Sequence, residues 1–377
     1  MPRIAACLIV RDEALQIERC LASLSQVCDE LCVLDTGSTD ATRELAHGLG
    51  ARVERFEWCD DFAAARNASL ALTSADWVLI VDADEQLDLA ASSPREVRER
   101  LESFAELHPL CAGRVRIENR LDDGEVSVAD VTRFVRRSSG AAFVGRIHEQ
   151  WLVRAGDSWV VPQRATTGVG LIHTGYHAAE RAAGLKSERN RRLLELELAA
   201  RPLDAYTHYQ LGRTLVSAGR HSQALPALER ALELSQESDE WAVHALELGA
   251  HALRALRRPR QALELVCEAL ELVPERTDTR FLAAGLALDC GDVELAEAGL
   301  RACLAQGPGP SSTVESSPCC GGWAAAYNLG VICEHSGRPG EAAELYRRAL
   351  ADRPTHRASL EGLARLELAL PSRPAIG

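Results

Sequence analysis

A repeated pattern of small residues in the second half of the chain restricts its fold more than any other sequence feature. A small or leucine residue precedes a glycine, and small or apolar residues recur about 12, 16 and 19 positions later. Close helix packing needs small residues at such spacing, so the pattern predicts stacked helix–turn–helix units. The four copies are Leu211-Gly212 with Ala224, Leu228 and Ala231; Leu248-Gly249 with Ala262 and Ala269; Ala284-Gly285 with Ala296 and Leu300; and Leu329-Gly330 with Ala342, Tyr346 and Ala349.

The distance between copies indicates which kind of repeat this is. Alanines at corresponding positions are 38, 34 and 46 residues apart, and a period near 34 residues is typical of tetratricopeptide repeats. The longest step contains a Gly-, Pro- and Ser-rich insertion over 307–322, which carries Cys319 and Cys320. We therefore predict an all-α tetratricopeptide-repeat solenoid over 203–370, with about four repeats and a concave face that could hold a peptide or a helix.

Residues 1–178 have a different pattern, in which short apolar runs alternate with helical stretches. Helices are predicted over 13–24 and 38–49, the second with Thr39 or Asp40 as its cap. Alternation of strands and helices predicts a mainly parallel sheet with right-handed crossovers, and unbroken apolar runs fit strands buried on both faces. We expect a Rossmann-like α/β domain over 1–178, then a helical connector over 179–202.

Composition narrows the class of partner and the compartment. The chain has 42 Lys and Arg against 55 Asp and Glu, a net charge of −13. This balance argues against binding of bulk nucleic acid, but not against a nucleotide held by local charge or by a metal ion. The apolar run Ile4–Val10 is too short to span a membrane, and no other stretch approaches a span. We expect no integral membrane segment, a cytoplasmic location, and 12 cysteines that are mostly reduced and buried.

Three carboxylate-bearing turns directly follow predicted strands. Ligands of open parallel sheets bind beyond the carboxyl ends of the strands, so these turns are predicted to face one common site. Asp82 and Asp84 are two residues apart, and a bend could direct both toward one cation; oxygen ligands suit Mg²⁺ or Mn²⁺. The turns are Arg11-Asp12-Glu13, Asp35-Thr36-Gly37-Ser38-Thr39-Asp40 and Asp82-Ala83-Asp84-Glu85.

Several segments together resemble glycosyltransferase family 2. The chain is similar in particular to the subgroup with a tetratricopeptide tail, which includes sublancin-type peptide S-glycosyltransferases. The lipopolysaccharide-core glucosyltransferases share the catalytic pattern, and the family usually has Asn at the position of Asp12. The segments are Ile9-Val10-Arg11-Asp12-Glu13, Val33 to Thr42, Phe62 to Asn67, Asp76 to Glu85, Arg146-Ile147-His148-Glu149-Gln150 and Leu171 to Tyr176.

This resemblance implies a GT-A fold and an inverting transfer of a sugar from a nucleotide-sugar. Asp35 would accept hydrogen bonds from the base or the ribose, Arg66 would lie near the pyrophosphate, and Asp82 would lie near the ribose. The other expected contacts with the nucleotide-sugar are Val10, Arg11, Glu13, Gly37, Ser38, Asn67 and Ala83.

The resemblance also implies a metal site and a catalytic carboxylate. Asp84 would bind the divalent metal, and His173 could complete the metal site from the far side. Glu149 occupies the place where the family has its catalytic carboxylate, and an inverting displacement needs one base to take the acceptor's proton. His148 could orient Glu149, serve as the base itself or touch the metal.

Plainer roles stay open for these residues on the sequence alone. Glu149 could pair with Arg146, and Arg66 could pair with Asp60 or Asp61. His173 could be an ordinary core or surface histidine.

These observations predict a metal-dependent enzyme that moves a hexose, with glucose as the favoured sugar, from a UDP-sugar to a peptide or protein side chain. Cys, Ser or Thr could be the acceptor, bound with help from the repeats, which could instead form a homodimer. One alternative is a transferase acting on lipopolysaccharide or glycolipid. An alternative of another class is a non-catalytic tetratricopeptide scaffold.

Overall fold

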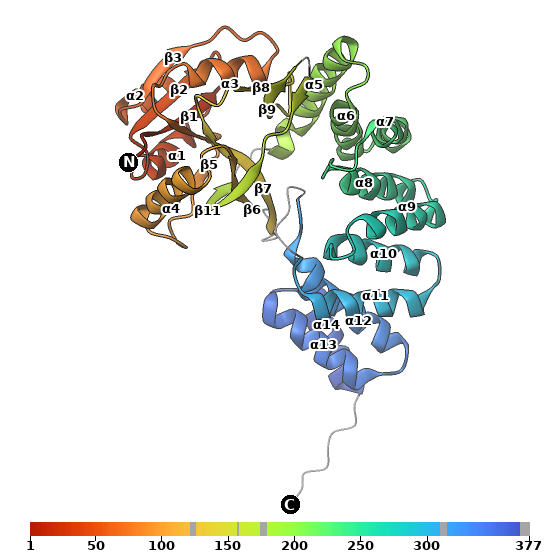
Figure 1. The fold of residues 1–377 in the computed structure, drawn as a ribbon. Coiled ribbons are helices and arrows are strands. Elements are labelled where there is room, and N and C mark those ends of the chain that lie inside the picture. Colours follow the sequence, from red (N-terminus) through yellow and green to blue (C-terminus); the bar gives the residue numbers. More distant parts are fainter. Residues whose placement is uncertain (121–125, 157, 174–178, 310–314, 370–377) are drawn as a thin grey trace, which may run out of the picture. The chain divides into compact units, whose positions relative to one another are not determined.

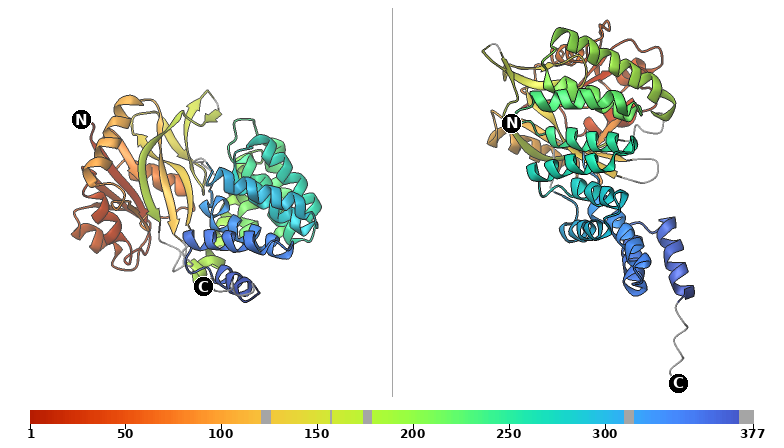
Figure 2. Two further views of the ribbon diagram at one scale, coloured as in Figure 1. Left: turned by 90° about the horizontal axis from the view of Figure 1, so that it is seen from below. Right: turned by 90° about the vertical axis from the view of Figure 1, so that its right-hand side faces the viewer.

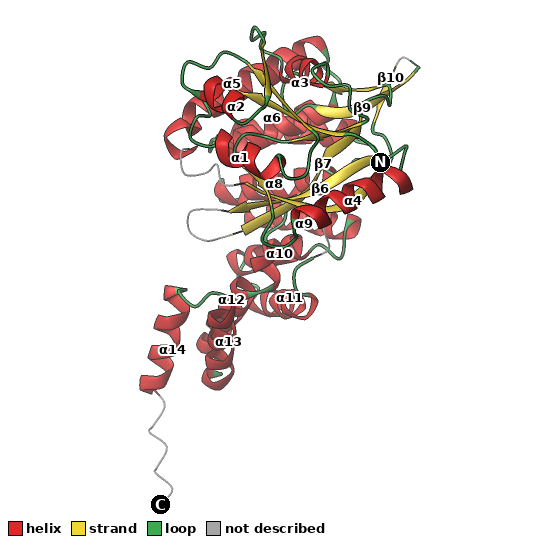
Figure 3. Cartoon of the chain, turned by 90° about the vertical axis from the view of Figure 1, so that its left-hand side faces the viewer, coloured by secondary structure: helices red, strands yellow, loops and turns green. Residues whose placement is uncertain are grey.

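The computed structural model describes residues 1–120, 126–156, 158–173, 179–309 and 315–369. The chain divides into two compact units, Met1–Thr214 and Leu215–Gly377. Figure 1 shows that the first unit combines sheets and helices, whereas the second is built from helices. Figure 3 shows the same separation by colour, with the strands confined to the first unit over the described ranges.

An eight-stranded mixed sheet forms the centre of the first unit. The four strands at one end are parallel, with β1 between β2 and β4. Strand β7 then runs antiparallel to both β4 and β6, while β11 runs parallel to β6 and antiparallel to β5. In sheet order the strands are β3 (Arg52–Arg55), β2 (Glu30–Asp35), β1 (Ile4–Val10), β4 (Trp77–Ile80), β7 (Val126–Arg136), β6 (Ala112–Arg120), β11 (Arg164–His173) and β5 (Glu85–Leu87).

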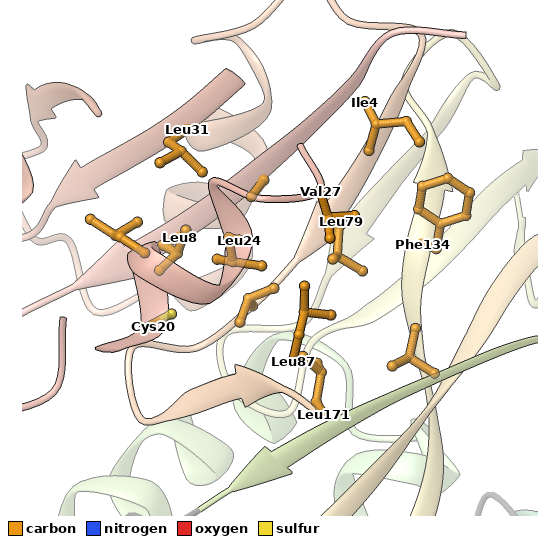
Figure 4. Close-up of a cluster of buried hydrophobic side chains, with 14 of the residues drawn as sticks. Ile4, Leu8, Cys20, Leu24, Val27, Leu31, Leu79, Leu87, Phe134 and Leu171 are labelled. Carbon is orange, nitrogen blue, oxygen red and sulfur yellow. The ribbon is translucent and has the colours of Figure 1, made fainter. Parts of the chain in front are cut away.

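Strand β1 shows why its apolar run is unbroken. Ile4 and Leu8 belong to one buried cluster, whereas Cys7 belongs to a second cluster on the opposite face of the sheet. Alternate side chains of a strand point to opposite faces, so a strand covered on both sides needs apolar residues throughout. Figure 4 shows part of the first cluster, where Leu8 and Leu24 lie among side chains from the sheet.

Helices cover both faces of this sheet. Helix α4 begins with a capping box, in which Ser93 Oγ accepts a hydrogen bond from Glu96 N–H. Asp61 caps α3 by accepting a hydrogen bond from Ala64 N–H at 2.8 Å. The helices of this unit are α1 (Ile17–Leu24), α2 (Thr42–Gly48), α3 (Phe62–Leu70), α4 (Pro94–Leu107), α5 (Ala179–Ala200) and α6 (Ala205–Ser217), the last of which crosses the boundary between the units.

The first two helices begin later than the sequence predicts. Helix α2 starts at Thr42, its cap position is Ala41, and no side chain caps it, so the expected cap by Thr39 or Asp40 is wrong. Asp40 instead accepts hydrogen bonds from Thr42 N–H and Ala14 N–H. The residues before both helices are thus used in turns at the ends of β1 and β2.

A second, three-stranded antiparallel sheet follows the main one in sequence. It contains β8 (Ala141–Val144), β9 (Gln150–Ala155) and β10 (Ser158–Val160). Phe143 of β8 and Trp151 of β9 are buried in the same cluster as Cys7. The segment between these two strands carries His148 and Glu149.

The second unit consists of helix pairs in the order that the repeat predicts (Figure 2). Pairs form between α8 and α9, α10 and α11, and α12 and α13. The repeat alanines on their second helices, Ala262, Ala296 and Ala342, are fully buried. The helices are α7 (His221–Leu234), α8 (Ala242–Ala255), α9 (Pro259–Leu272), α10 (Thr277–Asp289), α11 (Val293–Gln306), α12 (Trp323–His335), α13 (Pro339–Asp352) and α14 (Arg357–Ala369).

The predicted insertion over 307–322 lies between α11 and α12, and its residues 310–314 are outside the described ranges. Its later part forms a 3₁₀ turn, Pro318–Gly321, which includes Cys319 and Cys320. None of the 12 cysteines, all within the described ranges, forms a disulfide. Within the described residues, no helix is long and apolar enough to cross a membrane.

We predict that Gly330→Ala destabilises the second unit. A Cβ atom at Gly330 would lie 2.7 Å from Tyr346 Cε1, and Tyr346 is fully buried in the core of the repeats. Overpacking of this kind costs about 1–3 kcal/mol, which thermal or urea unfolding would measure. Gly340→Ala is the control, because a Cβ there meets no atom within 4 Å. Equal stabilities of the two variants would contradict the prediction.

Candidate active site

The turns after β1 and β2 are joined by hydrogen bonds. Asp12 adopts a left-handed backbone conformation (φ +56°), which brings its carboxylate to the second turn. Asp12 Oδ1 accepts hydrogen bonds from Thr39 N–H at 2.7 Å and from Thr39 Oγ1 at 3.1 Å, while Ser38 Oγ accepts one from Asp12 N–H. The Thr39 N–H bond is the main cause that lowers the pKa of Asp12. The first two carboxylate turns therefore form one structure.

Asp35 lies at the base of this structure, at the last position of β2. It is 2% exposed, and both its carboxylate oxygens lie within hydrogen-bond distance of Ser38 N–H (3.0 and 3.2 Å). Gly37 has a φ of +115°, a conformation that favours glycine, and allows this tight turn.

Asp82 lies between two arginines. Its Oδ1 pairs with Arg66 Nη2, and its Oδ2 accepts a hydrogen bond from Arg133 Nη2 at 2.7 Å. Burial by itself would raise the pKa of Asp82, but the charges of Arg133 and Arg66 outweigh it and hold that pKa well below its usual range. Asp82 is therefore ionised at neutral pH.

Arg66 connects Asp82 to Glu149. It donates a hydrogen bond from Nε to Glu149 Oε1 at 3.0 Å, across 83 residues of sequence. The Arg66 side chain is only 6% exposed, and its Nη1 has no hydrogen-bond partner within the described part of the chain. A buried donor without a partner is costly, and an anionic group placed beside Arg66 would satisfy it.

Asp84 and His173 meet because β5 pairs with the end of β11. In this antiparallel pair His173 lies opposite Glu85, the residue after Asp84. Asp84 Oδ2 lies 3.0 Å from His173 Nε2, and Asn119 Oδ1 lies 3.0 Å from His173 Nδ1. A proton on Nδ1, donated to Asn119, would leave the lone pair of Nε2 directed at Asp84.

These two residues fit a divalent cation as part of its ligand set. Carboxylate oxygen and imidazole nitrogen are both metal ligands, and ligating histidines usually donate their other ring N–H to a partner such as Asn119. Within the described residues, no group of three or more His, Cys, Asp and Glu side chains could hold a metal ion by itself. The remaining ligands would have to be substrate phosphate oxygens and water, as is usual for Mg²⁺.

His148 is held as a neutral imidazole. Burial, with the charges of Arg213 and Arg189, lowers the pKa of His148 to about 4. Its backbone is left-handed (φ +53°), in a short segment that also contains Gly145 with φ +105°. His148 is therefore uncharged at neutral pH, next to the ion-paired Glu149.

A family model described as glycosyl transferase family 2 matches residues 6–115, which extend from within β1 to within β6 and include the three carboxylate turns. The chain carries a family 2 glycosyltransferase domain. Tetratricopeptide repeat models match residues 205–238, 248–310 and 323–356. The family and the repeats predicted from the sequence are both confirmed.

Two curated proteins have sequences similar to this chain. A TPR repeat-containing protein of Synechococcus elongatus is 34% identical over 247 residues, which are 62% of this chain and 57% of that protein. The SPbeta prophage-derived glycosyltransferase SunS of Bacillus subtilis is 26% identical over 233 residues, which are 61% of this chain and 53% of SunS. The chain thus spans little more than half the length of these relatives.

Among solved structures, the chain is similar to YrrB, which is described as a TPR protein with an unusual peptide-binding site. It is 22% identical, and the alignment covers 49% of this chain and 88% of YrrB with a TM-score of 0.38.

The other residues predicted to contact the nucleotide-sugar differ in burial and in the contacts that they make. Asn67 binds the backbone of Phe143 at both ends of its amide, with Nδ2 donating to Phe143 O and Oδ1 accepting from Phe143 N–H, each at 2.9 Å. It ties α3 to β8, and the expected contact with a nucleotide-sugar gains no support. Val10 and Ala83 are buried, whereas Arg11 is exposed. Glu13 N–H donates to Thr42 Oγ1 within the joined turns.

The plainer pairings considered for two residues are wrong. Arg66 pairs with Asp82 and Glu149, not with Asp60 or Asp61. Arg146 pairs with Glu197, so it is not the partner of Glu149. The last predicted motif, over 171–176, is described only as far as His173; Gly175 and Tyr176 lie outside the described residues.

Arg133, Asn119 and Glu85 were not assigned roles from the sequence. Arg133 donates from Nη2 to both Asp82 and Glu85, and Glu85 Oε2 accepts a hydrogen bond from Asp82 N–H at 2.9 Å. Burial raises the pKa of Glu85 to about 7, although the charge of Arg133 opposes that rise. Arg133 lies in the middle of a strand, where no motif marks it. Asn119 could have been found only from the pairing of β6 with β11.

We predict that Arg133→Ala destabilises the first unit by roughly 3 kcal/mol. The change removes the guanidinium that Asp82 and Glu85 share, and the two carboxyl groups remain close together. Breaking a buried ion pair costs about 3–5 kcal/mol. The lower end is expected because Asp82 keeps 35% of its side chain exposed. Arg136→Ala is the control, since Arg136 is exposed and, among the residues that the structure describes, its side chain donates only to Pro109 O at 3.3 Å. Urea unfolding should separate the two variants, and equal losses of stability would refute the role given to Arg133.

Proposed function

We propose that this chain is a metal-dependent inverting glycosyltransferase, which moves a hexose from a UDP-sugar to a peptide or protein side chain. The observation that supports it most is a connected set of charged groups at one edge of the sheet. Asp84 and His173 lie 3.0 Å apart, and Asp82 and Glu149 are joined through Arg66. A bound metal ion can stabilise the charge of a leaving nucleoside diphosphate, and a positioned carboxylate can take the acceptor's proton.

The donor would lie across the joined turns of β1 and β2. Asp35 would accept hydrogen bonds from the base or the ribose, and Asp82 would face the ribose. Asp84 and His173 would hold a Mg²⁺ or Mn²⁺ ion, which when bound stabilises the negative charge of the leaving UDP. Arg66 would meet the pyrophosphate, and its buried Nη1, which has no partner in the described residues, supports this role.

The acceptor side of the reaction is assigned to Glu149. The acceptor's oxygen or sulfur attacks the anomeric carbon from the face opposite UDP and forms the new bond as the bond to UDP breaks. Glu149 takes the acceptor's proton, and UDP leaves with the bonding electron pair. Arg66 Nε holds Glu149 Oε1 at 3.0 Å, which fixes the direction of the carboxylate.

The test of the proposal is release of UDP from UDP-sugars. The full chain is incubated with UDP-glucose, UDP-galactose or UDP-N-acetylglucosamine, with Mn²⁺ or with EDTA. Metal-dependent UDP release supports the proposal, and turnover of UDP-glucose alone supports glucose as the sugar. Absence of both turnover and metal-dependent UDP binding would favour a non-catalytic scaffold.

The acceptor requires a separate measurement. Intact mass of candidate peptides after incubation with the preferred donor shows whether a hexose is added. Fragmentation then separates transfer to Cys from transfer to Ser or Thr. Modification of a glycolipid but of no peptide would support the lipopolysaccharide alternative.

A further inference from the structure

The segment Gly145–Glu149 carries the proposed base but has no regular secondary structure of its own. Gly145 and His148 both have positive φ values, +105° and +53°. Helix or ladder hydrogen bonds therefore cannot fix the backbone of this loop, and its position depends on bonds to other elements.

Neighbouring elements hold this loop at three points. Phe62 N–H, at the start of α3, donates to Arg146 O at 2.8 Å. Arg66 donates to the Glu149 side chain at the far end of the loop. The third point is Glu197 on α5, whose Oε2 accepts a hydrogen bond from Arg146 N–H at 3.0 Å. Both backbone polar groups of Arg146 are thus bound from outside the loop.

Glu197 is itself fixed in one orientation. It is 9% exposed, and its Oε1 accepts a hydrogen bond from Arg201 Nε at 2.7 Å. Arg201 also pairs with Asp204 at 3.1 Å, and the Arg146 guanidinium lies 3.8 Å from Glu197 Oε2. A carboxylate bound on both oxygens in this way is pre-organised as an acceptor for Arg146 N–H.

We infer that Glu197 is a positioning residue for the transfer reaction, which holds Arg146 and thereby places His148 and Glu149 at the reacting centre. The inference rests on the proposed function. It means that α5, which lies outside residues 6–115 of the family 2 match, contributes a residue needed for catalysis.

The geometry predicts which step depends on Glu197. The residues assigned to the donor and the metal lie on other elements: Asp35 ends β2, Asp84 precedes β5, and His173 ends β11. Loss of Glu197 should therefore leave UDP binding intact and lower turnover. A displacement of about 1 Å at a reacting group can cost about a hundredfold in rate.

The experiment compares three variants of the full chain. Glu197→Ala removes the acceptor for Arg146 N–H, whereas Glu197→Gln keeps an oxygen at that place. Glu195→Ala is the matched control, because Glu195 lies on the same helix, is exposed, and pairs only locally with Arg191. UDP release from the preferred UDP-sugar with Mn²⁺ gives kcat and KM, and calorimetry with UDP and Mn²⁺ gives donor-site affinity.

We expect kcat to fall about ten- to a hundredfold in Glu197→Ala, with UDP affinity unchanged, and to recover largely in Glu197→Gln. Glu195→Ala should match the parent chain. Unchanged kcat in Glu197→Ala, or equal loss of kcat and UDP affinity, would overturn the inference, because the second pattern indicates general unfolding.

Amide hydrogen exchange tests the same inference without any activity. Peptides that cover 145–149 should exchange faster in Glu197→Ala than in Glu195→Ala, while peptides that cover β1 and β2 should not change. If the parent chain neither turns over any UDP-sugar nor binds UDP in a metal-dependent way, the proposed function fails. The exchange result alone then decides whether Glu197 holds the loop. Equal exchange of the 145–149 peptides in Glu197→Ala and Glu195→Ala would refute that role of Glu197.

Discussion

Asp84→Ala is expected to lower UDP release from the preferred UDP-sugar by on the order of 10³-fold. Metal coordination contributes several kcal/mol to stabilising the charge of a leaving diphosphate, and each 1.36 kcal/mol is about a factor of ten in rate. Asp84 is the carboxylate that lies 3.0 Å from His173 Nε2, so its loss removes the oxygen ligand of this pair. Steady-state rates as a function of Mn²⁺ concentration measure the effect.

Two further variants make the Asp84 result interpretable. Asp88→Ala is the control, since Asp88 is close in sequence and half-buried, and within the described residues its side chain accepts a hydrogen bond only from Ala91 N–H. His173→Ala should also lower the rate of UDP release and make that rate less dependent on the Mn²⁺ concentration, as Asp84→Ala does. If Asp84→Ala keeps both its rate and its Mn²⁺ dependence, the metal site lies elsewhere and the assignment is wrong.

Glu149→Gln is expected to lower kcat by about 10²–10⁴-fold, the range that a general base contributes. Gln keeps the size of the side chain and can still accept the hydrogen bond from Arg66 Nε, but it cannot take a proton at neutral pH. Affinity for UDP with Mn²⁺ should stay the same, because Glu149 is assigned to the acceptor. Single-turnover rates and calorimetry on the same samples separate the two effects.

The rival for the base is His148, and a matched variant separates the two. His148→Gln should lower kcat less than Glu149→Gln does, because the proton is assigned to the Glu149 carboxylate, which Arg66 Nε holds in one direction at 3.0 Å. The reverse order of the two losses would assign the base to His148.

The part of the site that lies at the ends of the parallel strands could be predicted from the sequence. Strands β2, β1 and β4 are neighbours, so the turns at Asp12, Asp35 and Asp82 meet at one edge, as expected for a parallel sheet. Each of these turns follows an apolar run by only one or two residues. Local order along the chain was therefore enough to place them.

The rest of the site depends on pairings between distant parts of the chain. Arg133 and Asn119 come from β7 and β6, whose antiparallel pairing no motif reveals. Asn67 lies within a predicted motif, yet the position of β8 uses its amide for backbone contacts. Glu197 lies in a segment expected only to connect two domains. Side chains like these acquire a role from tertiary packing, which spacing in the sequence does not record.

The repeat half was more predictable because its contacts are local. Each helix pair uses residues within one period, and the fully buried alanines Ala262, Ala296 and Ala342 could be located from spacing alone. The helix starts in the first half were less predictable, since Asp40 and Ser38 serve the turns that precede α2. Competition between turn and helix for the same polar residues explains that difference.

The pairing of β5 with β11 has a consequence for how the enzyme matures. Asp84 and His173 are 89 positions apart, and only the docking of the last strand of the sheet brings them together. A nascent chain that has already folded β1 to β4 would have its joined turns but no place for the cation. If Asp84 and His173 form the metal site that we propose, metal affinity would appear only after β11 has joined the sheet.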